Sequence, residues 1–270
     1  MTKNQKIYFI TYGNRKFKTA KKHLINLAKH SDFFTECISM SPRDLNNNFS
    51  KKYTSILAAE RGAGYWIWKY EIINNLLKKI NTNDLIVYCD AGGSLNFHAK
   101  KRFYEYIDII NSSKLGNFRI ECESNYIENQ WTSQEVFNYF DLDINSHIGK
   151  STQLEAGHMI FKKNAHSVSF FEEFDNILNY DQNLITDKYN HSKQIDTFKE
   201  CRHDQSIFSI ISKKYGCEYI ENETEFKNRP QEQYSYPFLS VRQGGHGIKD
   251  KTKFFINYKS INTKPIYFEE

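Results

Sequence analysis

The sequence has little proline, glycine or cysteine, and it has no long hydrophobic run. Among its 270 residues only 4 are Pro and 12 are Gly, which argues against a disordered or low-complexity chain. No segment approaches the ~20 apolar residues of a membrane-spanning helix, and the apolar run near the N-terminus is too short for a signal peptide. We therefore expect a folded protein with no transmembrane segment, cytoplasmic and at most peripheral at a membrane.

The few cysteines do not form the pattern of a disulfide framework or a zinc site. Their number is odd, their spacing is wide and no CxxC pair occurs. This pattern indicates free thiols in a reducing compartment. The five cysteines are Cys37, Cys89, Cys122, Cys201 and Cys217.

Neither sign of charge dominates, since the net charge is only +5 and is spread along the chain. The densest basic stretch, residues 15–22, is typical of a solvated helix face, although a phosphate-rich ligand or an anionic membrane would also suit it. No RNP motif or zinc finger occurs, so we do not expect a nucleic-acid partner.

Aromatic residues, in contrast, are abundant at 16%, with 18 Tyr and 21 Phe, and predict a core built largely from rings. Residues 6–12 have the apolar pattern of a buried strand, 18–30 show helical spacing, and 33–39 suit a second strand. This β–α–β opening predicts an α/β fold with a central, mostly parallel sheet and helices on both faces.

The rest of the chain continues the alternation of strands and helices without an internal repeat or a linker. We therefore expect one domain, residues 1–270. Further strands are predicted at 85–89, 118–122 and 156–161, and further helices at 65–80, 100–110, 167–178 and 204–215.

Asp90 stands out because it directly follows the apolar run at residues 85–89 and precedes Gly92 and Gly93. Ligands of open α/β sheets lie outside the carboxyl ends of the strands. A carboxylate there, with backbone able to approach closely, suits Mg²⁺ or Mn²⁺, which commonly bridge to substrate phosphates. The alternative is that Asp90 only caps the turn after the strand.

Four segments in a fixed order resemble a group of GT-A-type glycosyltransferases from microbial and viral surface-polysaccharide gene sets. They are RGAGYWIWK at 61–69, LIVYCDAG at 85–92, QLEAG at 153–157 and RHDQS at 202–206. The resemblance runs from the first strand to at least residue 215. It implies a GT-A-like Rossmann-type fold, with a nucleotide-binding half at 1–115 and an acceptor-binding half at 116–270.

The resemblance also implies an activity. A hexosyltransferase of this type moves a sugar from a nucleotide diphosphate sugar, with a UDP-sugar as the expected donor, to a hydroxyl of a glycan or glycolipid. A divalent metal, Mn²⁺ or Mg²⁺, assists and would be held by Asp90. Many such enzymes carry an Asp-x-Asp motif, whereas Gly92 occupies the third position here, so fewer carboxylates would hold the metal.

Donor-site roles follow from the same resemblance. Thr11, Tyr12 and Gly13 would flank the base and ribose of the nucleotide. Arg61 and Lys69 would contact the diphosphate or the donor sugar, since their charge complements a pyrophosphate. An exposed helix residue is the alternative for Lys69.

The two tryptophans of WIWK are predicted to differ in role. Trp68 falls on the apolar stripe of the predicted helix and belongs to the core, whereas Trp66 is the better candidate for the cleft. Gly92 would let the backbone approach the donor. Tyr70 stands where a proline is common, which changes the start of a helix.

The second half would supply the acceptor side and the chemistry. Gln153 and Glu155 would lie at the edge where a donor or acceptor hydroxyl could be held, and Glu155 would act as a general base if the enzyme inverts configuration. Gln205, at the start of the following helix, would belong to the binding residues. Asp204, with His203 beside it, would be the catalytic or sugar-positioning carboxylate. The alternatives are a structural carboxylate for Glu155 and a helix cap for Asp204.

A glycine-rich segment near the C-terminus completes the set of candidates. His246 would be a second metal ligand, with Lys249 on the diphosphate. Two other classes of protein compete with the enzyme. One is a catalytically silent nucleotide- or carbohydrate-binding protein with the same fold. The other is a nucleotidyltransferase, which ranks last because the loop after the first strand contains a single glycine, Gly13.

Overall fold

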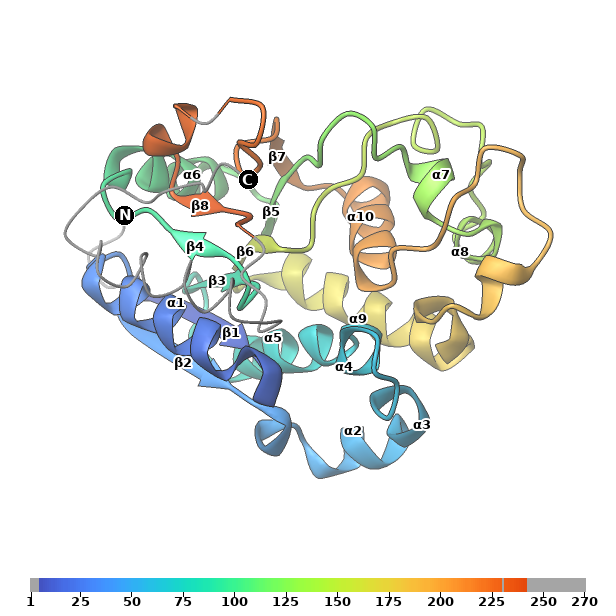
Figure 1. Ribbon diagram of the computed structural model, residues 1–270, viewed down its shortest axis with the longest axis horizontal. Coiled ribbons are helices and arrows are strands. Elements are labelled where there is room, and N and C mark those ends of the chain that lie inside the picture. Colours follow the sequence, from blue (N-terminus) through green and yellow to red (C-terminus); the bar gives the residue numbers. More distant parts are fainter. Residues whose placement is uncertain (1–4, 230, 242–270) are drawn as a thin grey trace.

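The protein is built around a six-stranded sheet with the strand order β2-β1-β3-β6-β5-β7 (Figure 1). The structure is a computed structural model and describes residues 5–229 and 231–241. The strands of this sheet are β1 (Ile7–Tyr12), β2 (Glu36–Met40), β3 (Leu85–Cys89), β5 (Asn117–Ile120), β6 (His158–Lys162) and β7 (Glu218–Ile220). The predicted β–α–β opening is confirmed.

One strand, β6, runs against all the others. β1 pairs in parallel with β2 and β3, and β5 pairs in parallel with β7, whereas β6 is antiparallel to both β3 and β5. The sheet is therefore mostly parallel, as predicted. Because Cys89 at the end of β3 pairs with His158 at the start of β6, the segment leading into β6 lies at the same edge as the carboxyl ends of β1 and β3.

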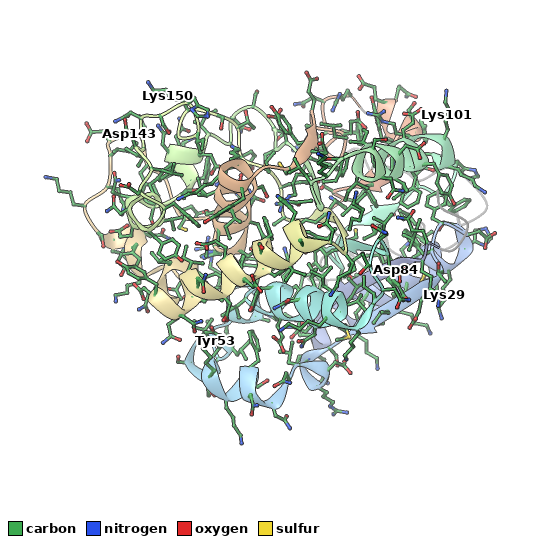
Figure 2. All side chains as sticks on the ribbon, turned by 180° about the vertical axis from the view of Figure 1, so that it is seen from behind. Lys29, Tyr53, Asp84, Lys101, Asp143 and Lys150 are labelled. Atoms are coloured by element: carbon green, nitrogen blue, oxygen red, sulfur yellow. The ribbon has the colours of Figure 1, made fainter. Side chains whose placement is uncertain are left out.

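Helices cover both faces of the sheet, again as predicted. α1 and α6 pack on one face and α5, α9 and α10 on the other, where α5 and α9 cross the side of the molecule seen in Figure 2. The longer helices are α1 (Lys18–His30), α5 (Trp68–Lys79), α6 (Lys100–Ser112), α9 (Ala165–Tyr180) and α10 (Asp204–Tyr215). The short helices are α2 (Asn47–Lys52), α3 (Thr54–Leu57), α4 (Gly62–Tyr65), α7 (Glu128–Trp131) and α8 (Gln134–Tyr139).

The central strand β3 shows why two helical layers are needed. All five residues of its sequence LIVYC are buried, and such a continuous apolar run is stable only when both faces of the strand are covered. Rings from many elements fill these layers. Phe33, for example, stacks on Phe103 of α6 with ring centroids 4.5 Å apart. The strand that we predicted at 33–39 starts too early, because Phe33 packs in the core ahead of the strand and β2 begins at Glu36.

The helix predicted at 65–80 is wrong at its start. Tyr65 and Trp66 have positive φ angles of 50° and 59°, which a right-handed helix cannot contain. The segment α4 is itself a left-handed turn, because all four of its residues have positive φ angles, and the regular helix α5 begins only at Trp68. Trp66 is therefore not part of a helical stripe, and its half-buried side chain packs against the edge of the core cluster that contains Trp68.

A small second sheet lies beside the carboxyl edge of the main one. It pairs β4 (Ser94–Leu95) with β8 (Phe238–Leu239) in antiparallel fashion. The pairing brings the last described residues back to the turn that follows β3. None of the helices in the described residues has both the length and the hydrophobicity of a membrane-spanning segment.

Candidate functional site

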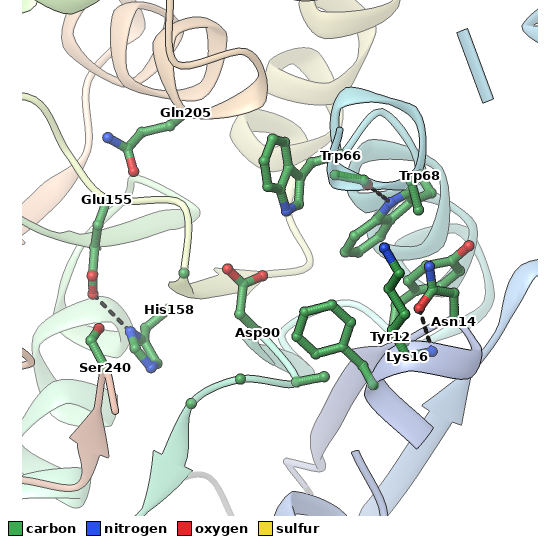
Figure 3. Close-up of a pocket in the computed structure, with 18 of the residues that line it drawn as sticks. Tyr12, Asn14, Lys16, Trp66, Trp68, Asp90, Glu155, His158, Gln205 and Ser240 are labelled. Carbon is green, nitrogen blue, oxygen red and sulfur yellow. Dashed lines mark hydrogen bonds and ion pairs between the residues drawn. The ribbon is translucent and has the colours of Figure 1, made fainter. Parts of the chain in front are cut away.

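A pocket of about 530 Å³ opens at the edge of the sheet where β1 and β3 end and β6 begins (Figure 3). The order of the strands sets the order of the lining residues. Tyr12, the last residue of β1, lies on one side of Asp90, and Glu155, before β6, lies on the other. Trp66 and Gln205 line the pocket from the helical layer. The carboxyl ends of the strands thus form the site, as expected for an open α/β sheet.

Asp90 is fixed by its own backbone and by its neighbours. Its N–H donates to the carbonyl of Gly157 at 2.8 Å, and its carbonyl accepts from Gly93 N–H at 2.8 Å, which closes the turn after β3. The Tyr88 hydroxyl donates to carboxylate oxygen Oδ1. The carboxylate is still 38% exposed and faces the pocket. Asp90 is therefore positioned to meet a ligand.

Lys69 is buried behind Asp90 and bridges two carboxylates. Its side chain is 2% exposed, and its Nζ lies 3.2 Å from Asp90 Oδ1 and 2.7 Å from Asp204 Oδ2. Nζ also donates to the carbonyl of Ala156 at 2.9 Å. Because the side chain is buried, the predicted contact of Lys69 with a diphosphate is wrong, and so is the alternative of an exposed helix residue. The Lys69 ammonium makes one hydrogen bond and two ion pairs inside the protein, where it fixes Asp90 relative to α10.

The charge of this cluster does not balance. Burial disfavours the ammonium, but the carboxylates of Asp204 and Asp90 outweigh it and raise the pKa of Lys69 above its ordinary value. Burial raises the pKa of Asp204 to about 6, although Lys69 opposes that shift. When both carboxylates are ionised, two negative charges face one positive charge, and Asp90 presents the surplus to the pocket.

Asp204 reaches the pocket only through this bridge. Its side chain is 6% exposed, and it is the first residue of α10 rather than its cap. The capping position belongs to His203, so the capping alternative for Asp204 is wrong. A buried carboxylate on Lys69 has the geometry of a positioning group, and the predicted direct contact of Asp204 with substrate is corrected accordingly.

His203 is also buried, at 2% exposure, and supports Trp66 from behind. Its Nδ1 lies 3.0 Å from the carbonyl of Ile185, and its ring stacks on Trp66 with centroids 5.5 Å apart. Burial and the nearby Arg61 lower the pKa of His203 to about 4, so the ring is neutral at pH 7. His203 does not line the pocket, whereas Trp66 does. Trp68 is buried in the core, as predicted, but its side chain also lines the pocket, so the pocket receives both tryptophans.

Glu155 lines the pocket across from Asp90. Its Oε1 lies 2.9 Å from His158 Nδ1, and its Oε2 accepts from the Thr224 hydroxyl at 3.1 Å. Between the two carboxylates lies Gly157. A Cβ at that position would lie 3.7 Å from Asp90 Oδ2 and 3.8 Å from Glu155 Oε2. The absence of a side chain there lets both carboxylates face the same volume.

Gln153 and Gln205, two predicted site residues, are joined by a hydrogen bond. Gln153 is fully buried, so its predicted contact with a hydroxyl is corrected. Its Oε1 accepts from Gln205 Nε2 at 2.8 Å. Gln205 lines the pocket and, through Oε1, accepts from Ala156 N–H at 3.4 Å. Gln153 therefore orients Gln205, which is the residue that can meet a ligand.

At the β1 end of the pocket, Tyr12 stacks on Trp68 with ring centroids 3.9 Å apart. Gly13 lines the pocket beside it, and a Cβ there would come within 2.9 Å of Phe17 Cβ. Thr11 is fully buried and does not line the pocket, so the predicted contact of Thr11 with a nucleotide is corrected. Its position in β1 places Tyr12 and Gly13 at the edge.

A second hollow of about 410 Å³ continues from this end of the pocket. The hollow extends toward Pro42 and Leu45 after β2. The residues that line both are Tyr12, Asn14, Lys16, Glu60 and Ala63. Together the pocket and the hollow form an elongated cleft across the ends of β2, β1 and β3. A ligand with an elongated, two-part structure fits such a shape.

Two groups of predicted residues lie elsewhere. The Arg61 guanidinium lies 3.2 Å from Asp187 and 2.8 Å from Glu200, and it is not among the pocket-lining residues, so its predicted contact with a diphosphate is corrected. His246 and Lys249 lie outside the described residues. Gly92 lines the pocket beside Asp90.

Several lining residues were not assigned a role from the sequence. Asn14 and Lys16 follow β1, and their place just after a strand end was the signal that could have identified them. His158 begins β6 and Arg202 directly precedes the HDQ segment. His158 directly follows the QLEAG segment and Arg202 is the first residue of the RHDQS segment, but position in or beside a motif does not distinguish a lining residue from a buried one.

The described residues meet part of the requirement for a divalent metal. They contain no group of three or more His, Cys, Asp or Glu side chains placed to hold a metal ion. Asp90 instead fits the arrangement in which Mg²⁺ or Mn²⁺ takes one or two carboxylates and completes its shell with phosphate and water. The surplus negative charge of the Lys69 cluster, presented by Asp90, suits a cation there.

Comparison with known proteins reveals similarity at the level of fold. No protein-family model matches the sequence, and no curated protein matches it. A glycosyltransferase involved in the glycosylation of the major capsid of PBCV-1 aligns over 93% of this chain and 97% of its own, with TM-score 0.51 and 10% identity. WbbM, a bifunctional glycosyltransferase, aligns over 100% of this chain and 47% of its own, with TM-score 0.50 and 12% identity. The chain therefore has the GT-A-like fold of these glycosyltransferases.

Proposed function

We propose that the protein is a glycosyltransferase that moves a sugar from a nucleotide diphosphate sugar to a hydroxyl of a glycan or glycolipid. The observation that carries the proposal is the buried Lys69, which fixes Asp90 at the carboxyl edge of β3 and leaves one surplus negative charge facing the pocket. A structural turn residue needs no such bridge. A fold alone does not imply a function, and this site is what supports a specific chemistry.

The shape of the cleft suggests how the donor lies. The hollow near Pro42 and Leu45 would take the nucleoside, next to Tyr12. The diphosphate would then lie near Asp90 and the Gly92–Gly93 backbone. The sugar would extend along the pocket toward Glu155 and Gln205. This order follows the strand order β2, β1, β3, β6.

A divalent cation is part of the proposal. A diphosphate would be repelled by the surplus negative charge of the cluster, since like charges at close range are strongly unfavourable in a partly buried site. Mg²⁺ or Mn²⁺ on Asp90, when bound, would neutralise charge on the leaving diphosphate. Lys69 would hold the carboxylate in place, and Tyr88 would fix its rotamer by a hydrogen bond.

Glu155 is the candidate for proton transfer at the acceptor hydroxyl. It lines the pocket on the side where the sugar would lie, and His158 and Thr224 orient its carboxylate. Gln205 would bind a sugar hydroxyl. UDP as the nucleotide and a hexose as the transferred sugar remain parts of the proposal that rest on the sequence resemblance alone.

The test of the site is a thermal-shift titration with UDP and GDP, each with and without Mn²⁺ or Mg²⁺. The wild type is expected to be stabilised by the nucleotide far more when metal is present. Asp90→Asn should lose the metal-dependent part. Asp143→Asn, which changes an exposed carboxylate on the other half of the chain, is the matched control and should keep it. Stabilisation that does not depend on metal would remove the cation from the proposal.

A silent binding protein with the same fold is the second candidate, because Gly92 replaces the second aspartate of the Asp-x-Asp motif. The two are separated by turnover. A glycosyltransferase should hydrolyse its correct nucleotide sugar slowly without acceptor, and Glu155→Gln and Asp90→Asn should reduce that rate. Nucleotide binding with no turnover across a broad donor panel, with glycan acceptors supplied, would establish the binding protein instead.

A further inference from the structure

Arg202 lines the pocket, and its guanidinium is held by aromatic rings. Its Cζ lies 4.9 Å from the centre of the Tyr126 ring and 5.3 Å from that of the Trp131 ring. Within residues 5–229 and 231–241, Arg202 forms no ion pair at 4.0 Å or less, because every such pair there involves another cationic side chain. A guanidinium has five N–H donors, so Arg202 is fixed by ring stacking while its donors stay available for an anion.

The backbone holds Arg202 in this place. Its N–H lies 3.0 Å from the carbonyl of Trp131 and 2.9 Å from Ser206 Oγ. Three residues earlier, Lys199 N–H donates to the carbonyl of Gln130 at 2.8 Å. The segment before α10 is therefore tied to α7 at two points, and the guanidinium is not on a freely moving loop.

A second cation extends the surface. Lys199 is exposed, and its Nζ lies 5.1 Å from the centre of the Trp131 ring. Tyr126 and Trp131 are half-buried, with ring centroids 5.2 Å apart. We call these four residues, Tyr126, Trp131, Lys199 and Arg202, the basic aromatic rim. It combines two positive charges with two rings.

The rim lies at the β6 end of the pocket. Arg202 is three residues before Gln205, whose side chain accepts a hydrogen bond from the backbone of Ala156, just before β6. Tyr12, Asn14 and Lys16 lie on the opposite side of Asp90 (Figure 3). If the nucleoside occupies the β1 side, as the proposed function requires, the rim is at the far end, beyond the transferred sugar.

We propose that the basic aromatic rim binds the acceptor and that this acceptor is an acidic sugar chain. Arg202 pairs with a carboxylate or phosphate of the acceptor through the parallel N–H groups of its guanidinium, a geometry that suits both anions. Lys199 adds a second, more exposed positive charge. The inference depends on the proposed function, because only the placement of the donor makes this end the acceptor end.

The test compares binding of three matched trisaccharides by titration calorimetry, with UDP or GDP and Mn²⁺ present. One carries a terminal glucuronate, one a terminal phosphate, and one a neutral glucose. The wild type is expected to bind at least one acidic trisaccharide about tenfold or more tightly than the neutral one. Arg202→Met, which keeps the packing on the rings but removes the charge, should abolish that preference. Lys199→Met should reduce it by a smaller factor.

Arg229→Met is the control, because Arg229 also stacks on a ring, that of Phe226 at 5.1 Å, but is paired with Glu232 and does not line the pocket. It should keep the preference. No preference for either acidic trisaccharide, no binding of any of them, or a preference that survives Arg202→Met would each overturn the proposal. A loss of nucleotide affinity in Arg202→Met with the preference intact would assign Arg202 to the donor. Failure of the proposed function itself would appear separately, as absence of nucleotide binding by the wild type.

Discussion

At the scale of single residues, Lys69 decides how the candidate site is held together. A charged group that is 2% exposed is stable only because two carboxylates and a carbonyl surround it. Removing the ammonium would leave Asp204 buried without a counter-charge. The residue thus links the stability of the fold to the position of Asp90.

Lys69→Met should destabilise the protein by about 3–5 kcal/mol, because it breaks a buried ion pair and keeps one partner. The free energy of unfolding in urea measures this. Lys78→Met changes an exposed lysine of the same helix and should change it by less than about 0.5 kcal/mol. Adding Asp204→Asn to Lys69→Met should recover part of the loss. Equal effects of the two lysine substitutions would contradict the assigned role.

His23 makes the stability of the fold depend on pH. It is buried in α1, and burial lowers its pKa from 6.5 to about 4. As the pH falls below 6.5 the unfolded chain gains a proton that the folded protein does not accept, so this contribution to stability is lost between pH 6.5 and 4.

His23→Gln removes the titration while keeping a polar side chain. The stability of the wild type relative to this variant should therefore fall by about 2 kcal/mol from pH 7.5 to pH 5. Urea unfolding of both proteins at the two pH values tests this, with His147→Gln as the control at a more exposed histidine. A difference that stays constant with pH would show that His23 is not the titrating group.

Sequence reasoning located some site residues and misplaced others for a physical reason. Asp90 was identified because a fully apolar strand followed by two glycines marks a strand end. Lys69 and Gln153 were placed in contact with ligand, whereas the structure buries both. Charge and polarity indicate that a residue has a partner, but they do not show whether that partner is a ligand or another side chain.

At the scale of elements, the break between α4 and α5 determines the lining of the pocket. Gly64 has a φ of +102°, and a Cβ there would lie 2.8 Å from the backbone Cα of Leu57 in α3. Only glycine permits this close approach. The turn that follows carries Trp66 to the pocket.

Gly64→Ala should cost about 1–3 kcal/mol in the free energy of unfolding and should also weaken nucleotide binding, because the α4 turn must shift. Gly216→Ala is the matched control. Its φ is +98°, but a Cβ there would meet only the flexible side chain of Leu115, far along the chain from the pocket. It should lower stability without changing nucleotide affinity. If Gly64→Ala and Gly216→Ala changed nucleotide affinity equally, the α4 turn would not be part of the nucleotide site.

Elements with a strong period were predictable, and those set by tertiary contacts were not. The helix at 204–215 was predicted at its observed bounds, and β3 likewise. The break at Tyr65–Trp66 was missed because neither residue favours a positive φ, so contacts rather than propensity impose it. The reversed direction of β6 left no trace in its sequence, since a buried strand has the same pattern in either direction.

At the scale of the whole molecule, the two halves of the chain share one core. The strands of the first half, β2, β1 and β3, lie beside β6, β5 and β7 of the second half in a single sheet. α6, from the first half, packs on β5 and β6, and β4 pairs with β8. The expected boundary near residue 115 therefore crosses a continuous core and does not separate two bodies.

The protein should accordingly unfold in one cooperative step. Urea unfolding followed by far-UV circular dichroism and by tryptophan fluorescence should give the same midpoint, because Trp66 and Trp68 report on the first half and Trp131 on the second. A fragment ending at residue 115 should not fold, since the edge of β3 would lose its partner. Two separate transitions, or a folded fragment, would show independent halves.

Gly157 leaves the space between Asp90 and Glu155 open, so a larger residue at this position would close the pocket there. Its φ lies outside the left-handed region, so a side chain there is not strained by the backbone. A valine would instead stand between Asp90 and Glu155 and fill the volume that both carboxylates face. Such a variant would not bind ligand in the pocket but would keep the outer surface of the native protein. Gly157→Val would therefore separate effects of the proposed catalytic activity from effects that need only the folded protein.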